Sequence, residues 1–264
     1  METALMINTK GLLVGSNNFW DRPPFPHAVI DNFFDREIAT TLESEFPAYE
    51  AEDWFIYENP VEVKRAQNNW NRFPPATYRA LAHLTSAEFT DQLSKYLGVT
   101  LFADPGLHGG GWHIHGDGGL LNPHLDYSIH PKYGLQRKIN LIVYLSTELK
   151  ETHGGHLGFW SHDNKNHQPG ELIVEIAPLF NRAVLFDTTM NSWHGLSRPL
   201  QCQGEKVFRK SLAVYYLCRP SLNAPIRPRA LYAPTDTQRN DDHVRAFIRE
   251  RAELQTPEQL HRTR

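Results

Sequence analysis

The 264-residue chain is long enough for one large β domain with extensions or for two small domains, and 40% of its residues are hydrophobic, enough to build a core. Its 27 lysines and arginines nearly balance 30 aspartates and glutamates, which leaves no global basic field to attract nucleic acid or an anionic membrane, and we expect neither partner. Two cysteines, Cys202 and Cys218, are too few for a disulfide framework. No stretch approaches the roughly 20 apolar residues of a membrane span, and residues 1–15 make a poor signal peptide. The sequence therefore predicts a cytoplasmic protein.

The N-terminal part, residues 1–98, is expected to form a strand and helices that pack on a central barrel. Residues 27–34 alternate like a strand, and residues 35–46 carry apolar side chains at helical spacing. Two further helical runs, 76–84 and 86–97, follow, and a glycine ends the second.

Between these helices lies a long aromatic segment, residues 48–75, without clear periodicity. Segments of this kind are usually functional loops or are ordered by packing. Two interpretations stay open: a lid over a substrate, or aromatic side chains that pack the helices onto the sheet. The side chains concerned are Trp54, Tyr57, Lys64, Trp70 and Arg72.

From residue 99 onward, short β-rich runs alternate with Gly, Pro and Asn. We predict a mainly β fold with flanking helices: a double-stranded β-helix, or jelly roll, of the cupin kind. Residues 99–220 are assigned to this catalytic core and residues 221–264, with one helix at about 240–254, to a C-terminal extension of the same structural domain. The β-rich runs are residues 107–115, 137–146, 154–160, 171–177, 182–188 and 206–218.

Two histidines and one carboxylate have the spacing of a metal site. His124 and Asp126 are two residues apart, so on a strand both side chains point to the same side and can bind one ion. The third ligand must come from elsewhere in the fold, and His194, after a predicted strand, is the best candidate; the following Gly195 permits a close backbone approach. Two histidines and a carboxylate leave open positions on a non-haem iron(II).

A second pair with the same spacing, His115 and Asp117, competes for this role. It lies in the sequence HGDGG, where the backbone lacks the rigid support that metal ligands need, so we favour His124 and Asp126. A zinc site drawn from the 14 histidines is another alternative, although no CxxC or HExxH motif supports it.

Arg209 is a charged residue on an otherwise apolar, alternating strand, where it shares one face with Ser211, Ala213 and Tyr215. A guanidinium can hold a carboxylate through two parallel hydrogen bonds, to which Ser211 adds a third and Tyr144 a hydroxyl. A fixed arginine beside a metal is what a dicarboxylate co-substrate requires.

Together, these motifs resemble those of the 2-oxoglutarate- and iron(II)-dependent oxygenases, in the prolyl 4-hydroxylase-like branch. NPHLDYS resembles the family's HxD motif, RKINLIVYLS followed by GGHLGFW its paired strands, RAVLFDTTMNSWHGLS the strand leading to the distal histidine, and FRKSLAVYY the final strand with the 2-oxoglutarate arginine. FPHAVIDNFFDREIATTLESEFP is similar to the leading strand and helix of many bacterial members. The resemblance implies iron(II) ligands at His124, Asp126 and His194, and 2-oxoglutarate contacts at Arg209, Tyr144 and Ser211.

The implied activity is that of a dioxygenase, which consumes 2-oxoglutarate and O2 and releases succinate and CO2. It implies hydroxylation of an unactivated C–H bond of a small molecule or of a peptidyl, prolyl-like substrate, with ascorbate as a stimulant. Asp126 fills the coordination position that a halogenase of this family leaves open for halide, which favours hydroxylation. Desaturation or ring formation by the same oxidant stays open, as does the identity of the substrate.

Three alternatives to this interpretation stay open. The family usually places its basic anchor closer to the distal histidine than Arg209 lies to His194 here, so Lys206 is a rival anchor. A zinc-dependent hydrolase would use the same three ligands but has no need of Arg209. A non-catalytic jelly-roll module that binds sugars would instead use the tryptophans Trp54, Trp70, Trp112 and Trp160.

Overall fold

The computed structural model describes residues 7–253; the expected charged C-terminal tail lies outside this range. None of the helices within it is long and apolar enough to cross a membrane. The α-helices are α1 (Thr9–Ser16), α2 (Arg36–Ser44), α3 (Pro75–Leu84), α4 (Ala87–Leu97) and α5 (Asp242–Glu253), with short 3-10 helices at Phe19–Asp21, Trp70–Arg72, Glu151–His153 and Asp236–Gln238.

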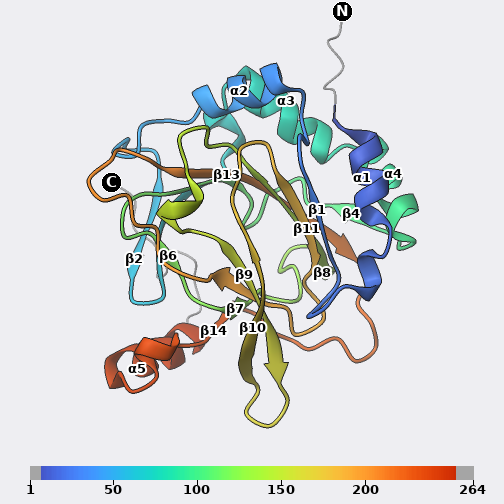
Figure 1. The fold of residues 1–264 in the computed structure, drawn as a ribbon. Coiled ribbons are helices and arrows are strands. Elements are labelled where there is room, and N and C mark those ends of the chain that lie inside the picture. Colours follow the sequence, from blue (N-terminus) through green and yellow to red (C-terminus); the bar gives the residue numbers. More distant parts are fainter. Residues whose placement is uncertain (1–6, 254–264) are drawn as a thin grey trace, which may run out of the picture.

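The strands of the described residues form two antiparallel sheets (Figure 1). They are β1 (His27–Ile30), β2 (Phe55–Asn59), β3 (Glu62–Gln67), β4 (Phe102–Ala103), β5 (Gly111–His115), β6 (Leu120–Leu121), β7 (His124–Leu125), β8 (Gln136–Tyr144), β9 (Leu157–Asp163), β10 (Gln168–Ile176), β11 (Ala183–Asp187), β12 (Trp193–Leu196), β13 (Arg209–Cys218) and β14 (Leu231–Tyr232). The larger sheet has the order β1-β11-β8-β13-β5-β3-β2, with β4 paired to β13 and β6 to β3, and the smaller sheet has the order β10-β9-β12-β7-β14. The mainly β jelly roll with flanking helices, predicted from the sequence, is confirmed.

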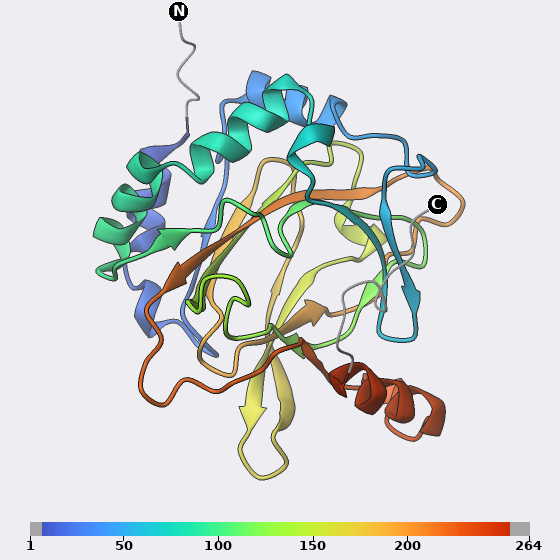
Figure 2. The same ribbon diagram turned by 180° about the vertical axis from the view of Figure 1, so that it is seen from behind.

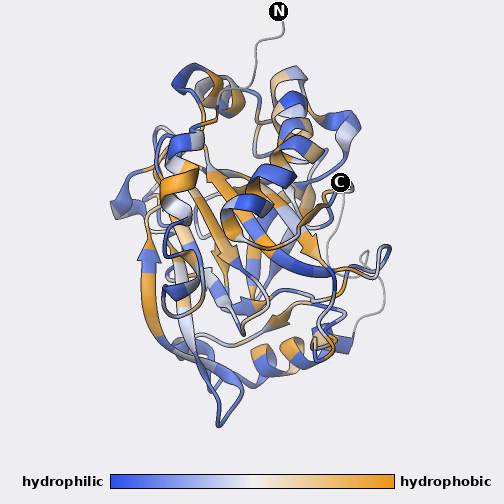
Figure 3. Ribbon diagram, turned by 90° about the vertical axis from the view of Figure 1, so that its right-hand side faces the viewer, coloured by the Kyte–Doolittle hydropathy of each residue, from blue (hydrophilic) through white to orange (hydrophobic). Residues whose placement is uncertain are grey.

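The helices α1 to α4 pack on the outer face of the larger sheet, as the reverse view shows (Figure 2). Alternate residues of β8 and β13, such as Leu141 and Val214, share one hydrophobic core with Leu81 of α3 and Leu93 of α4. Full burial of an aliphatic side chain of this size contributes about 1.5–3 kcal/mol. The hydrophobic strands therefore lie beneath the helices, while hydrophilic residues dominate the loops at the rim (Figure 3).

The two central helices form as the sequence predicted. The side-chain oxygen of Ser86 accepts a hydrogen bond from the backbone N–H of Phe89 and caps the start of α4. Gly98 ends the helix in the left-handed region with φ of +65°, a conformation that glycine adopts without a steric penalty.

The segment 48–75 is not the long loop that its composition suggested. It contains the hairpin β2–β3, which extends the larger sheet because β3 pairs with β5. Trp54 is 1% exposed and packs in the core, whereas Tyr57 and Lys64 face the space between the two sheets. The sequence did not predict strand β3, because the charged Glu62 and Lys64 occupy its inward face. The residue pattern therefore lacks the apolar side that marks a strand.

Gly111 starts β5 where the backbone at the end of β3 passes very close. It has a φ of +82°, and a Cβ atom there would overlap the carbonyl oxygen of Gln67. We expect Gly111→Ala to lower the free energy of unfolding by about 3 kcal/mol or more, because backbone and not a flexible side chain must move. Urea unfolding followed by tryptophan fluorescence measures this loss.

The matched control is Gly98→Ala. Gly98 has a similar φ, but nothing lies within 4 Å of the Cβ position, so this variant should lose only the roughly 1–2 kcal/mol of a left-handed alanine. Equal losses in the two variants would show that the contact at Gly111 is not the cause.

Candidate metal centre

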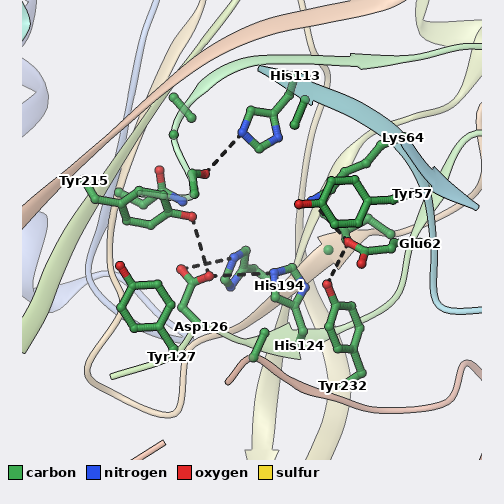
Figure 4. A pocket seen from close by; sticks show the side chains of 18 of the residues that line it. Tyr57, Glu62, Lys64, His113, His124, Asp126, Tyr127, His194, Tyr215 and Tyr232 are labelled. Atoms are coloured by element: carbon green, nitrogen blue, oxygen red, sulfur yellow. Dashed lines mark hydrogen bonds and ion pairs between the residues drawn. The ribbon is translucent and has the colours of Figure 1, made fainter. Parts of the chain in front are cut away.

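A cavity of about 1330 Å³ lies between the two sheets (Figure 4). Its walls come from the inward faces of β8 and β13, from the hairpin β2–β3, from β7 and β12 of the smaller sheet, and from the C-terminal end of α5. This volume exceeds the roughly 300–1000 Å³ of most small-molecule sites. The cavity therefore has room for more than one small ligand.

Three buried side chains, His124, Asp126 and His194, meet at one side of this cavity (Figure 4). One nitrogen or oxygen atom from each lies within 4.8 Å of the others. Strands β7 and β12 pair so that His124 is directly opposite His194. The structure thus brings together the three residues that the sequence singled out as metal ligands.

Gly195 permits the close approach between β12 and the segment before β7. A Cβ atom at this position would lie 2.6 Å from the carbonyl oxygens of Leu121 and Asn122, a separation that real Cβ atoms do not show. Any other residue at position 195 would therefore push β12 away from the strand that carries His124.

The two histidine rings are held with their Nε2 atoms facing Asp126. Nδ1 of His124 is 3.0 Å from the carbonyl oxygen of Asn122, and Nδ1 of His194 is 2.9 Å from that of Ser192. Each Nδ1 therefore carries the proton, which leaves Nε2 with a free lone pair. The Nε2 atoms lie 4.0 and 3.9 Å from the carboxylate oxygens of Asp126. Burial lowers the pKa of His124 to about 3 and also lowers that of His194, so both rings are neutral, as metal ligands must be.

Asp126 has one oxygen engaged and one free. Oδ1 lies 3.3 Å from the guanidinium of Arg137 and accepts a hydrogen bond from Tyr215 Oη at 3.5 Å, whereas Oδ2 is buried and has no hydrogen-bond partner among the described residues. Burial opposes the charged carboxylate, but the positive charges around it, that of Arg137 first, outweigh this effect and lower the pKa of Asp126. One anionic oxygen and two neutral imidazole nitrogens, all without partners, fit a divalent metal such as iron(II).

Sequence reasoning missed Arg137, which stacks between the rings of Tyr127 and Tyr215 at 3.6 and 3.5 Å. Simple alternation along β8 places Arg137 on the opposite side from Asn140. The register shifts at Lys138, however. Ile139 pairs with Tyr216 and Arg137 pairs with Leu217, so Lys138 has no partner of its own on β13. This bulge turns Arg137 into the cavity, and no local sequence signal marks it.

Arg209 lies at the other end of the cavity and carries a buried charge without an acidic partner. Its side chain is 4% exposed, and no carboxylate of residues 7–253 lies within ion-pair distance. Nε donates to the carbonyl oxygen of Gly155 at 2.7 Å, and Nη2 contacts Tyr144 Oη at 3.2 Å. Ser211 lies on the same inward face of β13, opposite Tyr144. The remaining guanidinium donors are thus available to an anion in the cavity.

The rival residues from the sequence do not join the group formed by His124, Asp126 and His194. Asp117 accepts a hydrogen bond from the backbone N–H of Cys202 at 2.7 Å and does not line the cavity, and Lys206 is exposed in the loop before β13. The sequence predicted a poorly supported backbone at His115. This residue instead lies at the end of β5 and is 2% exposed. Trp54 and Trp112 are buried in the core, which removes them from any sugar-binding surface.

Comparison with protein families gives one match: residues 110–217 match the model described as the 2OG-Fe(II) oxygenase superfamily. The matched region contains all the residues singled out above as candidate ligands of the metal and of the co-substrate. The resemblance drawn from the sequence is thereby confirmed. Comparison with curated proteins gave no match.

The fold is similar to those of several solved prolyl hydroxylases. A prolyl-4-hydroxylase from Pseudomonas putida aligns with a TM-score of 0.55 and 16% identity over 79% of this chain and 99% of its own. One from Phytophthora capsici aligns with a TM-score of 0.54 and 19% identity over 95% of this chain and 78% of its own. One from Trichoplax adhaerens, solved with a hypoxia-inducible-factor peptide fragment, aligns with a TM-score of 0.53 and 15% identity over 79% of this chain and 88% of its own. At these identities the likeness concerns the fold alone.

The choice between the two HxD pairs can be tested by metal binding. We expect His124→Ala, Asp126→Ala and His194→Ala each to weaken cobalt(II) or iron(II) binding by more than about 100-fold, because loss of a ligand should exceed the 10–100-fold effect of losing an outer contact. His115→Ala and Asp117→Ala should bind within a few-fold of the parent. Anaerobic titration with metal content measured by mass spectrometry reads this out, and loss of metal in Asp117→Ala but not in Asp126→Ala would reverse the assignment.

Proposed function

We propose that this chain hydroxylates an unactivated C–H bond of a small-molecule or peptidyl substrate. Its match to the 2OG-Fe(II) oxygenase superfamily over residues 110–217 supports this proposal, because the match makes the chain a 2-oxoglutarate-dependent dioxygenase. His124, Asp126 and His194 hold iron(II). Arg209, Tyr144 and Ser211 hold the carboxylate of 2-oxoglutarate that lies farther from the metal.

The observation that carries this proposal is the buried, uncompensated charge of Arg209. Burying a cation without an acidic partner is costly, and removing one member of a buried ion pair typically costs 3–5 kcal/mol. A protein retains such a charge when an anionic ligand completes the pair. A metal-dependent hydrolase has no use for it, whereas a dicarboxylate that bridges the metal and the far wall does.

The roles of the protein groups follow from their positions. When bound, iron(II) together with 2-oxoglutarate and O2 supplies an oxidant that removes hydrogen from an unactivated C–H bond, and the co-substrate leaves as succinate and CO2. Asn122 and Ser192 fix the imidazole tautomers through their carbonyl oxygens, and Arg137 leaves a single oxygen of Asp126 for the metal. The site lies between two sheets, so water is largely excluded from the reacting groups.

The carboxylate of Asp126 also bears on the outcome of the reaction. It fills a coordination position that a halide would need, which supports delivery of oxygen to the substrate in preference to chlorine. The peptide complex of the Trichoplax enzyme concerns that enzyme; for this chain we retain both peptide and small-molecule substrates.

The anchor can be tested by a 2-oxoglutarate titration. We expect Arg209→Ala to raise the concentration required for half-saturation by about 30-fold or more, because a buried charge pair of this kind contributes on the order of 2–5 kcal/mol. Lys206→Ala, which removes a charge from the exposed loop nearby, should change it less than about twofold. The opposite ranking would move the anchor to Lys206.

The reaction class can be tested with isotopes. In a survey of metabolites and peptides with iron and ascorbate present, a true substrate should yield one succinate per product, and the product should gain one oxygen atom from labelled O2, as read by mass spectrometry. Chloride should be neither incorporated nor required.

Oxygen arriving from labelled water without consumption of 2-oxoglutarate would contradict the oxygenase assignment and favour metal-assisted hydrolysis. A product that is two hydrogens lighter, with succinate formed, would keep the assigned residues and change the outcome to desaturation or ring closure.

A further inference from the structure

A row of side chains crosses the inner face of the larger sheet from the co-substrate anchor to the hairpin β2–β3. Arg209 of β13 is paired with His115 of β5, and Lys64 of β3 is paired with Tyr57 of β2. Because Arg65 is opposite Ile114, Lys64 follows next to His115 in the same row. Adjacent strands are about 4.8 Å apart, so Lys64 lies roughly 10 Å from Arg209 along the sheet. The two cations are therefore far enough apart to bind separate anionic groups.

Lys64 faces the cavity from a partly closed environment (Figure 4). Its side chain is 13% exposed, and its Nζ lies 3.3 Å from Oε2 of Glu62. Lys64 lines the same cavity as His124, Asp126 and His194. A ligand bound to Lys64 would thus lie beside the site of reaction.

Glu62 is shared between Lys64 and a second cation. This carboxylate is 1% exposed. Its Oε2 atom accepts a hydrogen bond from Tyr232 Oη at 3.0 Å, and its Oε1 atom forms an ion pair with Arg251 of α5. Together these two contacts already satisfy both oxygens. One buried carboxylate therefore faces two cations, and an ammonium group has three donors to offer. Glu62 cannot balance both Lys64 and Arg251, so one positive charge of this group is left over, and Lys64 offers it to the cavity.

The whole cavity has an excess of positive charge. Among the described residues, five arginines and lysines line it, against three aspartates and glutamates. The charges of iron(II) and of 2-oxoglutarate cancel, so the loaded site keeps an excess of two positive charges. The histidines outside the metal centre do not alter this count, because burial lowers the pKa of His108 to about 4, that of His113 to about 3 and that of His115 well below its usual range. In a site of low dielectric, this excess favours an anionic substrate.

We propose that Lys64 binds an anionic group of the substrate, a carboxylate or a phosphate, and thereby holds the reacting C–H bond next to the metal. This inference rests on the proposed function, which it deepens by naming the substrate class. The cavity volume of about 1330 Å³ leaves room for such a substrate beside the co-substrate.

The test uses the protein loaded with redox-inert zinc(II) and 2-oxoglutarate, so that binding is measured without turnover. Three probes of similar shape are titrated by ligand-observed NMR: phenylacetate, phenyl phosphate and the neutral phenylacetamide. We expect at least one anion to bind about tenfold tighter than the amide, and the two anionic probes distinguish a carboxylate from a phosphate.

Three variants locate the binding group. Lys64→Met, which keeps most of the length of the side chain but removes its charge, should abolish the preference for the anion and leave the amide unchanged. Lys64→Arg should preserve the preference. The control is Arg72→Met, which removes a half-exposed charge paired with Asp53 on the same segment and should behave like the parent. Retained 2-oxoglutarate affinity in Lys64→Met shows that the variant is folded.

Several outcomes would overturn the inference: anions that bind no tighter than the amide, a preference that survives in Lys64→Met, or a loss of 2-oxoglutarate affinity in that variant, which would assign Lys64 to the co-substrate. Binding of 2-oxoglutarate to the parent protein is measured first and by itself. Its absence would contradict the proposed function, and the probes would then be titrated into the zinc form alone, so the two failures remain distinguishable.

Discussion

The site depends on the pairing of two very short strands, β7 and β12, which sets His124 opposite His194. These strands come from segments that are far apart in the chain, and their contact allows no Cβ atom at Gly195. The same contact fixes the orientation of the rings, because the carbonyl oxygen of Asn122 that approaches Gly195 also receives Nδ1–H of His124. Close backbone packing and the correct imidazole tautomer thus arise from one constraint.

The second organising feature is a set of buried charged groups whose polar atoms the protein leaves partly without partners. Asp126 divides its two oxygens between Arg137 and the cavity, and Arg209 has no acidic partner within residues 7–253. Such arrangements are unfavourable in an empty fold and become favourable once ligands of opposite charge enter. The cavity is therefore organised for a cation at one end and for an anion at the other.

The parts predicted from sequence were those with local periodicity or fixed spacing. The alternation of β13 placed Arg209 and Ser211 on one face, and the HxD spacing selected His124 and Asp126. The hairpin β2–β3 was missed because its inward residues are charged, which removes the hydrophobic alternation that marks a strand. Arg137 was missed for a different reason: the bulge at Lys138 reverses the parity of β8, and only the partner strand reveals it.

The aromatic ring of Tyr232 joins the pair formed by Glu62 and Lys64 to the candidate metal centre. It stacks on the imidazole of His124 with centroids 5.0 Å apart, and its hydroxyl holds Glu62, which in turn contacts Lys64. A continuous chain of contacts therefore runs from the proposed substrate contact Lys64 to the candidate metal ligand His124. Coupling between two binding sites is reciprocal. If an anion on Lys64 changes the affinity for the metal by some factor, the metal changes the affinity for that anion by the same factor. Order of addition then matters only to rates, and the two ligands share a single thermodynamic cycle.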